Sequence, residues 1–534
     1  MNILLINLTR FGDLLQTQPV IHGLKAQGHR IGLLCLENFA PAAALLDGVD
    51  HVAALPGSAL LATLDADWRR ALAGIHDVLH RLQQDFPADA VCNTTATLSA
   101  RLLARRLAPT DSRILGFGMD DEGFGISGDI WATFLQGASA ERCNCPFNIV
   151  DMFRAAAGVA DTSPRTGLRP PDATVMQDVD ALLRQCRPAE TPEGYVAFQL
   201  GASEARRQWP VAHFAAVGKA LWEKARLCPI LLGSPAERPL AAAYAAASPA
   251  VPHIDAVGGT DIPRLAGILR RTRLLISNDT GTMHLAAGLG IPVLGIFLAT
   301  AQPWDTGPYL PGCCCLEPAL PCHPCGFQSP CAHENRCLHS ISAETVSVLA
   351  HSFLREGAWP VLPPGADARA WLTGVDATGF ADLHPLSAHG QEERSQWLRM
   401  QRHYYRHIID GLNGHTRPVP ASGVDTRGLS PLFRQDIATA MRQSEELLHL
   451  LCEQTALLRH MPGQQAGQRL LGTCHRIGTV LRHCRPLTAL GHLWTVLAQE
   501  RGESLDGVVG MATQLRRHLA AWREELLAVG HSGT

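Results

Sequence analysis

The chain has 534 residues, of which 46% are hydrophobic and 18% are charged, and its formal net charge is -3. This composition is that of a folded globular protein, and the length exceeds what one compact core can serve, so we expect two or three domains. A nearly balanced charge gives the chain as a whole no electrostatic attraction for nucleic acid, and no nucleic-acid partner is predicted.

The N-terminal residues are not expected to form an export signal. Their apolar run is broken at Arg10 and Asp13, and no basic segment precedes it. No later segment reaches the roughly 18 uninterrupted apolar residues of a membrane span. We therefore expect a cytoplasmic protein, in which the 16 cysteines are better explained as buried thiols and a metal site than as disulfides.

Short apolar runs alternate with helical patterns through the first part of the chain. The alternation predicts strands at residues 3–8, 30–36, 51–54, 88–92 and 113–117. Helices are predicted from about Leu14 and at residues 68–86 and 98–107. Strands that alternate with helices indicate parallel β-α-β units, so residues 1–160 are expected to form a Rossmann-like domain.

The same alternation restarts after a stretch rich in Pro, Thr and Asp at residues 161–174, which we interpret as a linker. Strands are predicted at residues 195–200, 228–232, 274–277 and 293–297, with helices between them. Residues 175–356 are therefore expected to form a second Rossmann-like domain with a parallel sheet.

Beyond residue 357 prolines mark a break, and the rest of the chain has only helical patterns. One predicted helix spans residues 392–412, and the next begins at Ser430 as the N-cap, with Pro431 in its first turn. Further helices are predicted at residues 470–484, 490–497 and 508–527. Residues 385–534 are expected to be an α-helical extension.

Three strand-to-helix turns carry short polar or charged side chains, and ligands of open parallel sheets bind at the carboxyl ends of the strands. The first turn contains Gly12, which lets the backbone approach a ligand, and Asp13. The Asp13 carboxylate could face a cleft between the domains as a catalytic group. Alternatively, it caps the helix that begins near Leu14.

The second turn contains Gly201 and Ser203, followed by Arg206 and Arg207 before Pro210. Free backbone N–H groups and a guanidinium form a cradle for phosphate, although an exposed basic turn has the same sequence. The third turn is rich in groups that can bind a diphosphate or a ribose, or that can cap the next helix: Asp279, Thr280, Gly281, Thr282 and His284.

Together, the segments TRFGD, GAS…RRQWP and SNDTGTMHLAAGLGIPVLGIF resemble glycosyltransferase family 9, the heptosyltransferase family of lipopolysaccharide core synthesis. The resemblance covers about residues 1–352. It implies an α/β GT-B fold of two Rossmann-like domains with parallel sheets that face a cleft, here with an additional α-helical C-terminal domain. It also implies a nucleotide-diphosphate sugar donor, an acceptor on the side of the N-terminal domain, inversion at the anomeric carbon, and catalysis that requires no cofactor.

The resemblance assigns roles to residues of all three turns. Asp13 matches the proposed general base that deprotonates the acceptor hydroxyl. Arg207 stands where the family usually has Lys in a K-x-W-P pattern, which keeps the charge beside the donor diphosphate and adds a planar fork. The nucleotide-sugar loop of the family is matched by Asp279, Thr280, Gly281 and His284. Further donor-binding candidates are Gly12, Gly201, Ser203 and Thr282.

Residues 120–145 form a polar, Gly-rich insertion in the first domain. Since the N-terminal half of the resembled fold binds the acceptor, the insertion could shape the acceptor site. Alternatively, it is a mobile surface loop.

The segment 313–337 is rich in cysteine, and four of its cysteines have the spacing C-x2-C-x5-C-x5-C: Cys322, Cys325, Cys331 and Cys337. Thiols this close in sequence, with Pro and Gly between them, suit a tetrahedral structural site for zinc or iron, in which nearby histidines could substitute as ligands. Reduced thiols without a metal are the alternative. A similar cluster occurs in some members of the resembled family, including iron-containing protein heptosyltransferases.

These observations predict an inverting glycosyltransferase that moves a sugar, such as a heptose, from a donor like ADP-heptose to a hydroxyl of a lipopolysaccharide-type or other glycan. The alternatives are a protein O-heptosyltransferase that modifies a surface protein and a non-catalytic scaffold that binds sugar nucleotides. An epimerase could share the architecture, whereas a dehydrogenase is disfavoured because no G-x-G-x-x-G follows the first strand. The C-terminal helices could support oligomerisation, partner binding or a peripheral contact with the inner membrane, or form an ordinary bundle.

Overall fold

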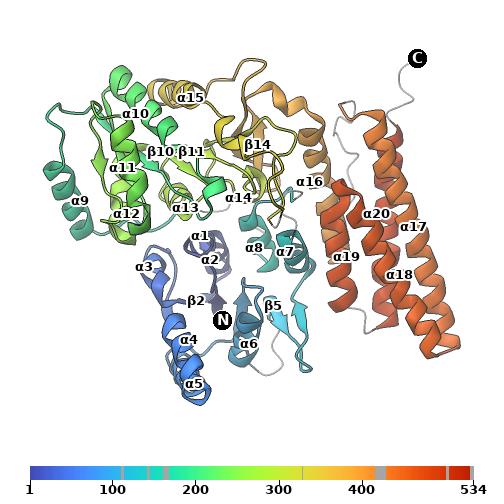
Figure 1. The fold of residues 1–534 in the computed structure, drawn as a ribbon. Coiled ribbons are helices and arrows are strands. Elements are labelled where there is room, and N and C mark those ends of the chain that lie inside the picture. Colours follow the sequence, from blue (N-terminus) through green and yellow to red (C-terminus); the bar gives the residue numbers. More distant parts are fainter. Residues whose placement is uncertain are drawn as a thin grey trace. The chain divides into compact units, whose positions relative to one another are not determined.

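The computed structural model describes residues 1–109, 114–140, 145–159, 167–327, 329–414, 428–500 and 504–528. The chain separates into two compact units, each built from two stretches of sequence. One unit comprises Met1–Arg113 and Asn148–Gly390 and contains the α/β sheets, and the other comprises Ile114–Phe147 and Gln391–Thr534 and is mostly helical (Figure 1). Two mostly parallel sheets and a helical C-terminal region confirm the predicted fold class.

The first sheet contains parallel strands in the order β3-β2-β1-β4. Their bounds are β1 (Asn2–Ile6), β2 (Arg30–Leu36), β3 (His51–Leu55) and β4 (Ala90–Asn93). The central strand β1 has side chains buried on both faces, from Ile3 to Ile6, as expected for a parallel strand covered by helices on both sides. The helices of this half are α1 (Phe11–Leu15), α2 (Gln18–Ala26), α3 (Ala40–Ala43), α4 (Gly57–Ala66), α5 (Trp68–Asp85) and α6 (Leu98–Leu107).

Two helices lead from the first sheet to the second. Helix α8 (Ile149–Ala156) begins where the Asn148 side chain accepts the N–H of Val150. Helix α9 (Ala173–Gln185) is capped in the same way by Asp172. The linker predicted at residues 161–174 lies partly outside the described residues, and its last two residues already belong to α9.

The second sheet has the strand order β14-β13-β12-β11-β10-β7-β8-β9. Its parallel strands are β7 (Gly194–Gln199), β8 (Leu227–Leu232), β9 (Ile254–Asp255), β10 (Thr272–Asn278), β11 (Val293–Ile296) and β12 (Cys314–Pro318). The helices of this half are α10 (Val211–Ala225), α11 (Arg238–Ala247), α12 (Ile262–Leu269), α13 (Gly281–Gly288), α14 (Pro303–Thr306) and α15 (Ala343–Glu356).

The second sheet continues beyond residue 357, where the sequence predicted only helices. Strands β13 (Ala368–Val375) and β14 (Ala381–Pro385) pair antiparallel with each other, and β13 pairs antiparallel with β12. The turn between them is closed by the Asp376 carboxylate, which accepts the N–H groups of Thr378 and Phe380 at 2.8 and 3.1 Å. The prediction was wrong here because the prolines that precede β13 break the chain locally without ending the domain.

The helical unit consists of a β-hairpin and six helices among its described residues. The hairpin joins β5 (Leu115–Met119) to β6 (Gly125–Ser127). The helices are α7 (Ile130–Ala140), α16 (Glu393–Leu412), α17 (Pro431–His460), α18 (Gln464–His483), α19 (Thr488–Glu500) and α20 (Leu505–Ala528). The Ser430 side chain accepts the N–H of Phe433 at 3.3 Å, so the predicted N-cap of α17 is confirmed.

The insertion at residues 120–145 is not a mobile surface loop in its described part. Helix α7 buries Trp131 and Phe134, and the Phe134 ring lies 5.9 Å from that of Tyr405 on α16. A Cβ on Gly137 would lie 3.1 Å from the backbone N of Leu493 on α19, so the two helices approach closely. The described part of the insertion therefore belongs to the core of the helical unit. Its polar and Gly-rich sequence did not indicate this burial.

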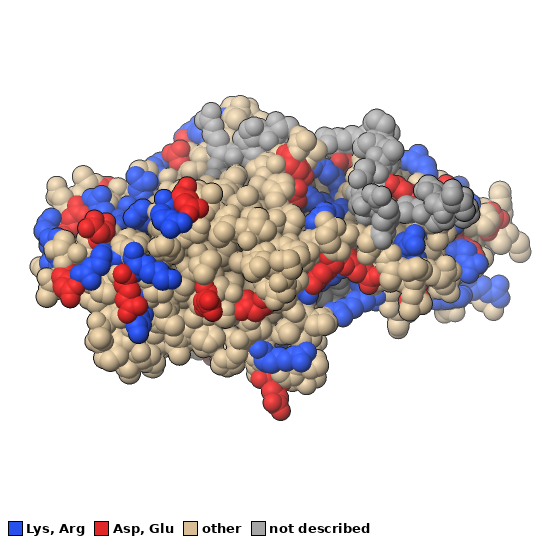
Figure 2. All heavy atoms as spheres, turned by 90° about the horizontal axis from the view of Figure 1, so that it is seen from above, with Lys and Arg blue, Asp and Glu red and all other residues tan. Residues whose placement is uncertain are grey.

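On the face shown in Figure 2, basic and acidic side chains are interspersed, in keeping with the formal net charge of -3. None of the helices within the described ranges has both the length and the apolar character that crossing a bilayer requires.

Candidate active site

The first turn follows β1 and leads directly into α1, which begins at Phe11 rather than near Leu14. Gly12 and Asp13 therefore lie in the first turn of a helix. The half-buried Asp13 carboxylate accepts the N–H of Arg10 at 3.4 Å, so it does cap this helix. The cap uses one of its oxygens, and the acid remains partly open to solvent.

The side chain of Asn7 fixes the same turn. Its amide nitrogen donates to the Thr94 hydroxyl, at the end of β4, at 3.1 Å. Its amide oxygen accepts the N–H of Thr9 at 3.2 Å. The turn that carries Asp13 is thus tied to the neighbouring strand by a buried amide, which satisfies polar groups that would otherwise be costly to bury.

The first and third turns meet. A Cβ on Gly12 would lie 3.0 Å from His284 Cδ2 and 3.1 Å from Gly281 Cα, and a Cβ on Gly281 would lie 2.4 Å from Phe11 Cδ1. A side chain at residue 281 would force the Phe11 ring to shift, and one at residue 12 would be tightly packed, because the first turns of α1 and α13 lie very close together. Asp13 is therefore brought beside the predicted nucleotide-sugar loop.

The second and third turns are joined by hydrogen bonds of Asn278, at the end of β10. Its amide nitrogen donates to the carbonyl oxygens of Leu200 and Gly201 at 2.9 and 3.2 Å. Its amide oxygen accepts the N–H of Trp209 at 2.9 Å. The Thr282 hydroxyl also donates to the Gln199 side chain at 3.0 Å. All three predicted turns thus lie in one region of one compact unit.

A buried ion pair connects the predicted phosphate-binding arginine to the third turn. The Arg207 guanidinium donates to the Asp279 carboxylate, and Arg207 also donates to the Ser203 hydroxyl at 3.3 Å. Both charged side chains are less than 10% exposed. The Nε of Arg207 is buried without a hydrogen-bond partner. A buried donor of this kind is normally satisfied by a ligand or a water, so the guanidinium retains capacity for a phosphate oxygen.

Gly201 has a packing role. A Cβ at this position would lie 1.4 Å from the Glu237 carboxylate, in the 3-10 turn η4 (Pro235–Glu237). The Glu237 carboxylate in turn accepts the N–H of Ser234 at 2.6 Å. The need for glycine at residue 201 is therefore explained by protein contacts, whether or not a donor also approaches it.

Sequence reasoning did not identify Thr306 of α14. Its hydroxyl donates to the Asp279 carboxylate at 3.4 Å and to the buried Asp305 carboxylate at 3.3 Å. A signal was available, because the polar turn after β11 is one more strand end on the same edge of the sheet.

The four predicted metal ligands lie in a loop that is only partly buried. Cys322 and Cys325 are half-buried, Cys331 is exposed and Cys337 is buried. Burial, and then the charges of the other three thiols, raises the pKa of Cys325. Two backbone N–H groups, of His333 and Asn335, donate to Cys331 at 3.4 and 3.3 Å.

The chemistry of four thiols fits zinc or iron. The geometry is not that of a completed site, because no three His, Cys, Asp or Glu side chains within the described residues are arranged to hold a metal ion.

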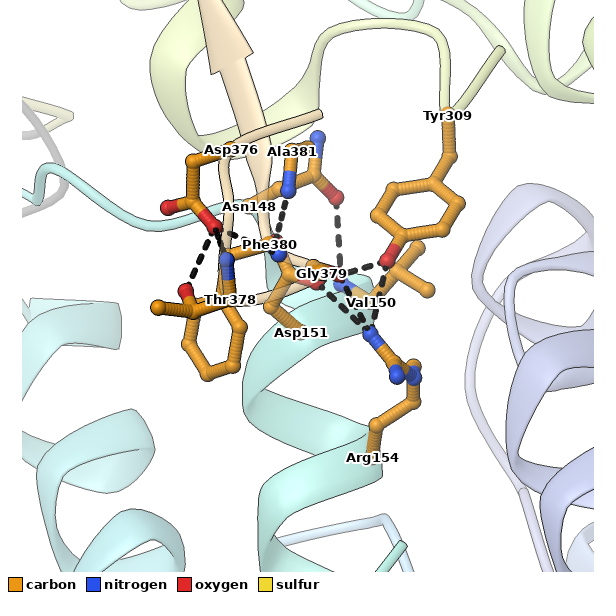
Figure 3. A network of polar contacts seen from close by, with 10 residues as sticks. All are labelled: Asn148, Val150, Asp151, Arg154, Tyr309, Asp376, Thr378, Gly379, Phe380 and Ala381. Atoms are coloured by element: carbon orange, nitrogen blue, oxygen red, sulfur yellow. Dashed lines mark hydrogen bonds and ion pairs between the residues drawn. The ribbon is translucent and has the colours of Figure 1, made fainter. Parts of the chain in front are cut away.

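A second buried network ties α8 to the added hairpin, as Figure 3 shows. One Arg154 nitrogen donates to the Asp151 carboxylate at 3.2 Å, to the Tyr309 hydroxyl at 3.0 Å and to the Gly379 carbonyl at 3.0 Å. The Tyr309 hydroxyl and the N–H of Ala381 donate to Asp151 at 2.6 and 2.8 Å. Burial, and then the charge of Asp151, raises the pKa of Tyr309 far above its usual value. Each charge here has protein partners, so we assign this network to the fold.

Residues 150–335 match the model of glycosyltransferase family 9 (heptosyltransferase). Residues 150–335 thus resemble a glycosyltransferase family 9 domain. The matched range includes the second and third turns and most of the cysteine-rich segment, whereas Gly12 and Asp13 lie outside it.

The sequence of the chain is similar to that of lipopolysaccharide heptosyltransferase 1 of Pseudomonas aeruginosa, with 29% identity over 153 residues. That similarity covers 28% of this chain and 41% of the relative, so the chain spans less than half of the relative's length.

Two solved structures are similar to this chain at low sequence identity. A family 9 glycosyltransferase of Veillonella parvula is 18% identical, with 58% of this chain and 83% of that chain covered and a TM-score of 0.47. The Escherichia coli ADP-heptose lipopolysaccharide heptosyltransferase II is 15% identical, with 67% of this chain and 99% of that chain covered and a TM-score of 0.49.

Proposed function

We propose that the protein is an inverting glycosyltransferase that transfers a sugar, such as a heptose, from a nucleoside-diphosphate donor of the ADP-heptose type to an acceptor hydroxyl. The observation that carries the proposal is the close approach of Gly12 to Gly281, because the helix turn that contains Asp13 then adjoins the loop that contains Asp279 of the Arg207–Asp279 pair. The matched family model and the named relative support the same reaction class.

In the proposed reaction the acceptor oxygen forms a bond to the anomeric carbon while the bond from that carbon to the donor phosphate breaks. Asp13 takes the proton of the acceptor hydroxyl. The departing diphosphate gains negative charge, which Arg207 and the backbone N–H groups at the start of α13 stabilise. Polar side chains hold the nucleotide part of the donor: Ser203, Thr280, Thr282 and His284.

A donor panel with detection of released nucleoside diphosphate tests this proposal. We expect wild-type protein to release ADP from ADP-heptose only when an acceptor is present. Asp13→Asn should reduce the rate by about 10²–10⁴-fold, the usual contribution of a general base, and should leave the Kd for ADP unchanged. Full activity in Asp13→Asn would refute the base assignment. Binding of ADP-heptose without transfer to any acceptor would favour the scaffold alternative.

The acceptor is proposed to be a glycan of the lipopolysaccharide type, in line with the name of the similar P. aeruginosa protein. The panel should therefore include a truncated lipopolysaccharide core and unmodified surface proteins with exposed serines, each analysed by mass spectrometry for an added sugar. Modification of the core alone would support the proposal. Modification of protein alone would replace it with the protein O-heptosyltransferase alternative.

An amphipathic acceptor is consistent with an exposed apolar face on α4 and α5. This face consists of side chains that are all at least half exposed: Leu61, Leu64, Trp68 and Leu72. The Arg69 guanidinium lies 4.8 Å from the centre of the Trp68 ring, and Arg70 is beside it. Exposed Trp and Leu next to arginine are typical of helices that lie on anionic membranes. We propose that this face makes the peripheral contact with the membrane.

Vesicle co-sedimentation tests the membrane contact. Wild-type protein should pellet with vesicles that contain phosphatidylglycerol and not with pure phosphatidylcholine vesicles. Leu61→Glu combined with Trp68→Glu should abolish pelleting, whereas Leu432→Glu, at an equally exposed leucine of the helical unit, should not. Equal pelleting of the double variant would exclude this face.

We also propose a structural zinc or iron ion at Cys322, Cys325, Cys331 and Cys337, supported by their thiol chemistry and their C-x2-C-x5-C-x5-C spacing. When bound, the ion would cross-link the loop. Elemental analysis should find about one equivalent in wild-type protein and a loss in Cys322→Ser, with Cys452→Ser, a half-buried thiol of the helical unit, as the control. Protein purified without metal from metal-replete medium would contradict this site.

A further inference from the structure

The cysteine-rich segment contacts the second turn through Arg206, the neighbour of Arg207. The Arg206 guanidinium donates to the carbonyl oxygens of Phe327 and Ser329 at 2.8 and 3.1 Å. Its Nε donates to the Glu204 carboxylate at 2.7 Å. These bonds hold the planar Arg206 guanidinium between two backbone carbonyls of the cysteine-rich segment. Arg206 therefore has a defined orientation, unlike a charged side chain that extends freely into solvent.

The same segment also holds the turn that follows β11. Ala299 in this turn has a φ of 53°, in the left-handed region that a residue with a Cβ seldom adopts. Its carbonyl oxygen accepts the N–H of Cys325 at 2.8 Å. An unfavourable backbone conformation persists only where its surroundings enforce it, and here the Ala299 carbonyl is bound by the cysteine-rich segment.

Both contacts involve residues that are connected to the Arg207–Asp279 ion pair. Arg206 precedes Arg207, which binds the Asp279 carboxylate. Ala299 begins the short stretch that ends at Thr306, whose hydroxyl donates to that same carboxylate at 3.4 Å. The cysteine-rich segment therefore reaches both partners of the Arg207–Asp279 pair from two directions.

We infer that Arg206 and Ala299 are positioning residues, through which the segment 322–337 holds the Arg207–Asp279 pair in the geometry that binds the donor diphosphate. This inference rests on the proposed function, because it gives the cysteine-rich segment a task in donor binding. The segment then acts on donor affinity without contributing a ligand to the donor.

Binding of ADP to the full-length chain, measured by calorimetry, tests the inference. Arg206→Ala should raise the Kd for ADP about tenfold. Arg206→Lys should restore little of this loss, since a single ammonium cannot replace the fork between two carbonyls. Recovery of full affinity by Arg206→Lys would mean that residue 206 acts by its charge on the diphosphate, and would overturn the positioning role. Arg264→Ala, at an exposed arginine of the same unit that pairs with Asp178, is the matched control and should leave the Kd unchanged.

A second variant approaches from the other side. Ala299→Val places a β-branched side chain at a positive φ, which this residue type tolerates poorly, so it should also raise the Kd for ADP. Since both variants loosen one segment, their effects should be less than additive when combined. Strict additivity would contradict the inference.

Hydrogen exchange separates failure of this inference from failure of the proposed function. Arg206→Ala should speed amide exchange in residues 299–302 and 325–337 of the protein without nucleotide, while Arg264→Ala should not. Unchanged exchange in Arg206→Ala would overturn the positioning role even if ADP binds well. If wild-type protein bound no ADP, the donor proposal would fall, and the exchange result would still decide whether the segment holds this turn.

Discussion

Arg207 and Asp279 come from different strand ends and form an ion pair whose side chains are 9% and 7% exposed. At such burial each charge depends on the other, because an isolated ion in a protein interior is strongly unfavourable. The pair thus fixes the second turn to the third while leaving the buried Arg207 Nε unsatisfied by the protein. The structural role and the proposed ligand-binding role therefore fall on the same guanidinium.

Removal of one partner of this pair should cost more than removal of both. Arg207→Ala leaves the Asp279 carboxylate buried without its partner, and we expect the free energy of unfolding to fall by about 3–5 kcal/mol. The double variant Arg207→Ala with Asp279→Ala should recover part of that loss, since no charge is left unpaired. Denaturant unfolding of the three proteins measures both quantities. Simple addition of the two single effects would show that the pair is not coupled as its geometry indicates.

The contact between α1 and α13 predicts a different sensitivity at two glycines. Gly281→Ala introduces a Cβ 2.4 Å from Phe11 Cδ1, and we expect a loss of about 1–3 kcal/mol from overpacking together with loss of transferase activity. Gly472→Ala is the matched control, because no atom lies within 4 Å of its Cβ and it lies inside α18. There alanine should stabilise the protein by about 0.5–1 kcal/mol. A Gly281→Ala variant with wild-type stability and activity would mean that the two helices do not pack as described.

The sequence predicted the two sheets well because their strands are short apolar runs bounded by turns, with helical spacing between them. It could not predict β13 and β14 after a proline-rich break, because a hairpin of two strands has no long periodic signal. The membership of residues 114–147 in the helical unit was equally hidden. Trp131 and Phe134 look like core residues of any helix, and only the fold shows which partner covers them.

The candidate site was likewise only partly predictable from the sequence. The three turns were recognisable because glycine and short polar residues follow buried strands, a pattern that marks ligand sites in parallel sheets. The pairing of Arg207 with Asp279 could not be predicted, since the two residues are far apart in sequence and each also suits a phosphate or a helix cap alone. The contact of Arg206 with two backbone carbonyls leaves no sequence signal at all, because a carbonyl is present at every residue.

Because α7 packs into the helical unit, the C-terminal helices should not be removable by truncation. A chain that ends at residue 390 would expose the buried faces of Trp131 and Phe134. We expect this truncation to aggregate or to bind the dye ANS, which reports exposed apolar surface. A second truncation in which a Gly/Ser linker also replaces residues 114–147 should be more soluble. Equal solubility of the two would show that α7 does not need the C-terminal helices.

The helical unit should also lose stability in mild acid because of one histidine. Burial, and then the charges of Arg517 and His407, lowers the pKa of His518 from 6.5 to about 4. The unfolded chain would bind a proton on this side chain near pH 6.5, whereas the folded chain resists protonation until about pH 4. The stabilising contribution of neutral His518 is therefore complete above pH 6.5 and is lost as the pH falls toward 4.

Thermal unfolding from pH 7 to pH 4 should show a steeper fall in Tm for wild-type protein than for His518→Gln, which does not titrate. His475→Gln, at an exposed histidine of α18, provides the mutational control. Parallel curves for wild type and His518→Gln would mean that His518 is hydrated in the folded protein, and that the contact of its ring with Gly411 on α16 is not maintained.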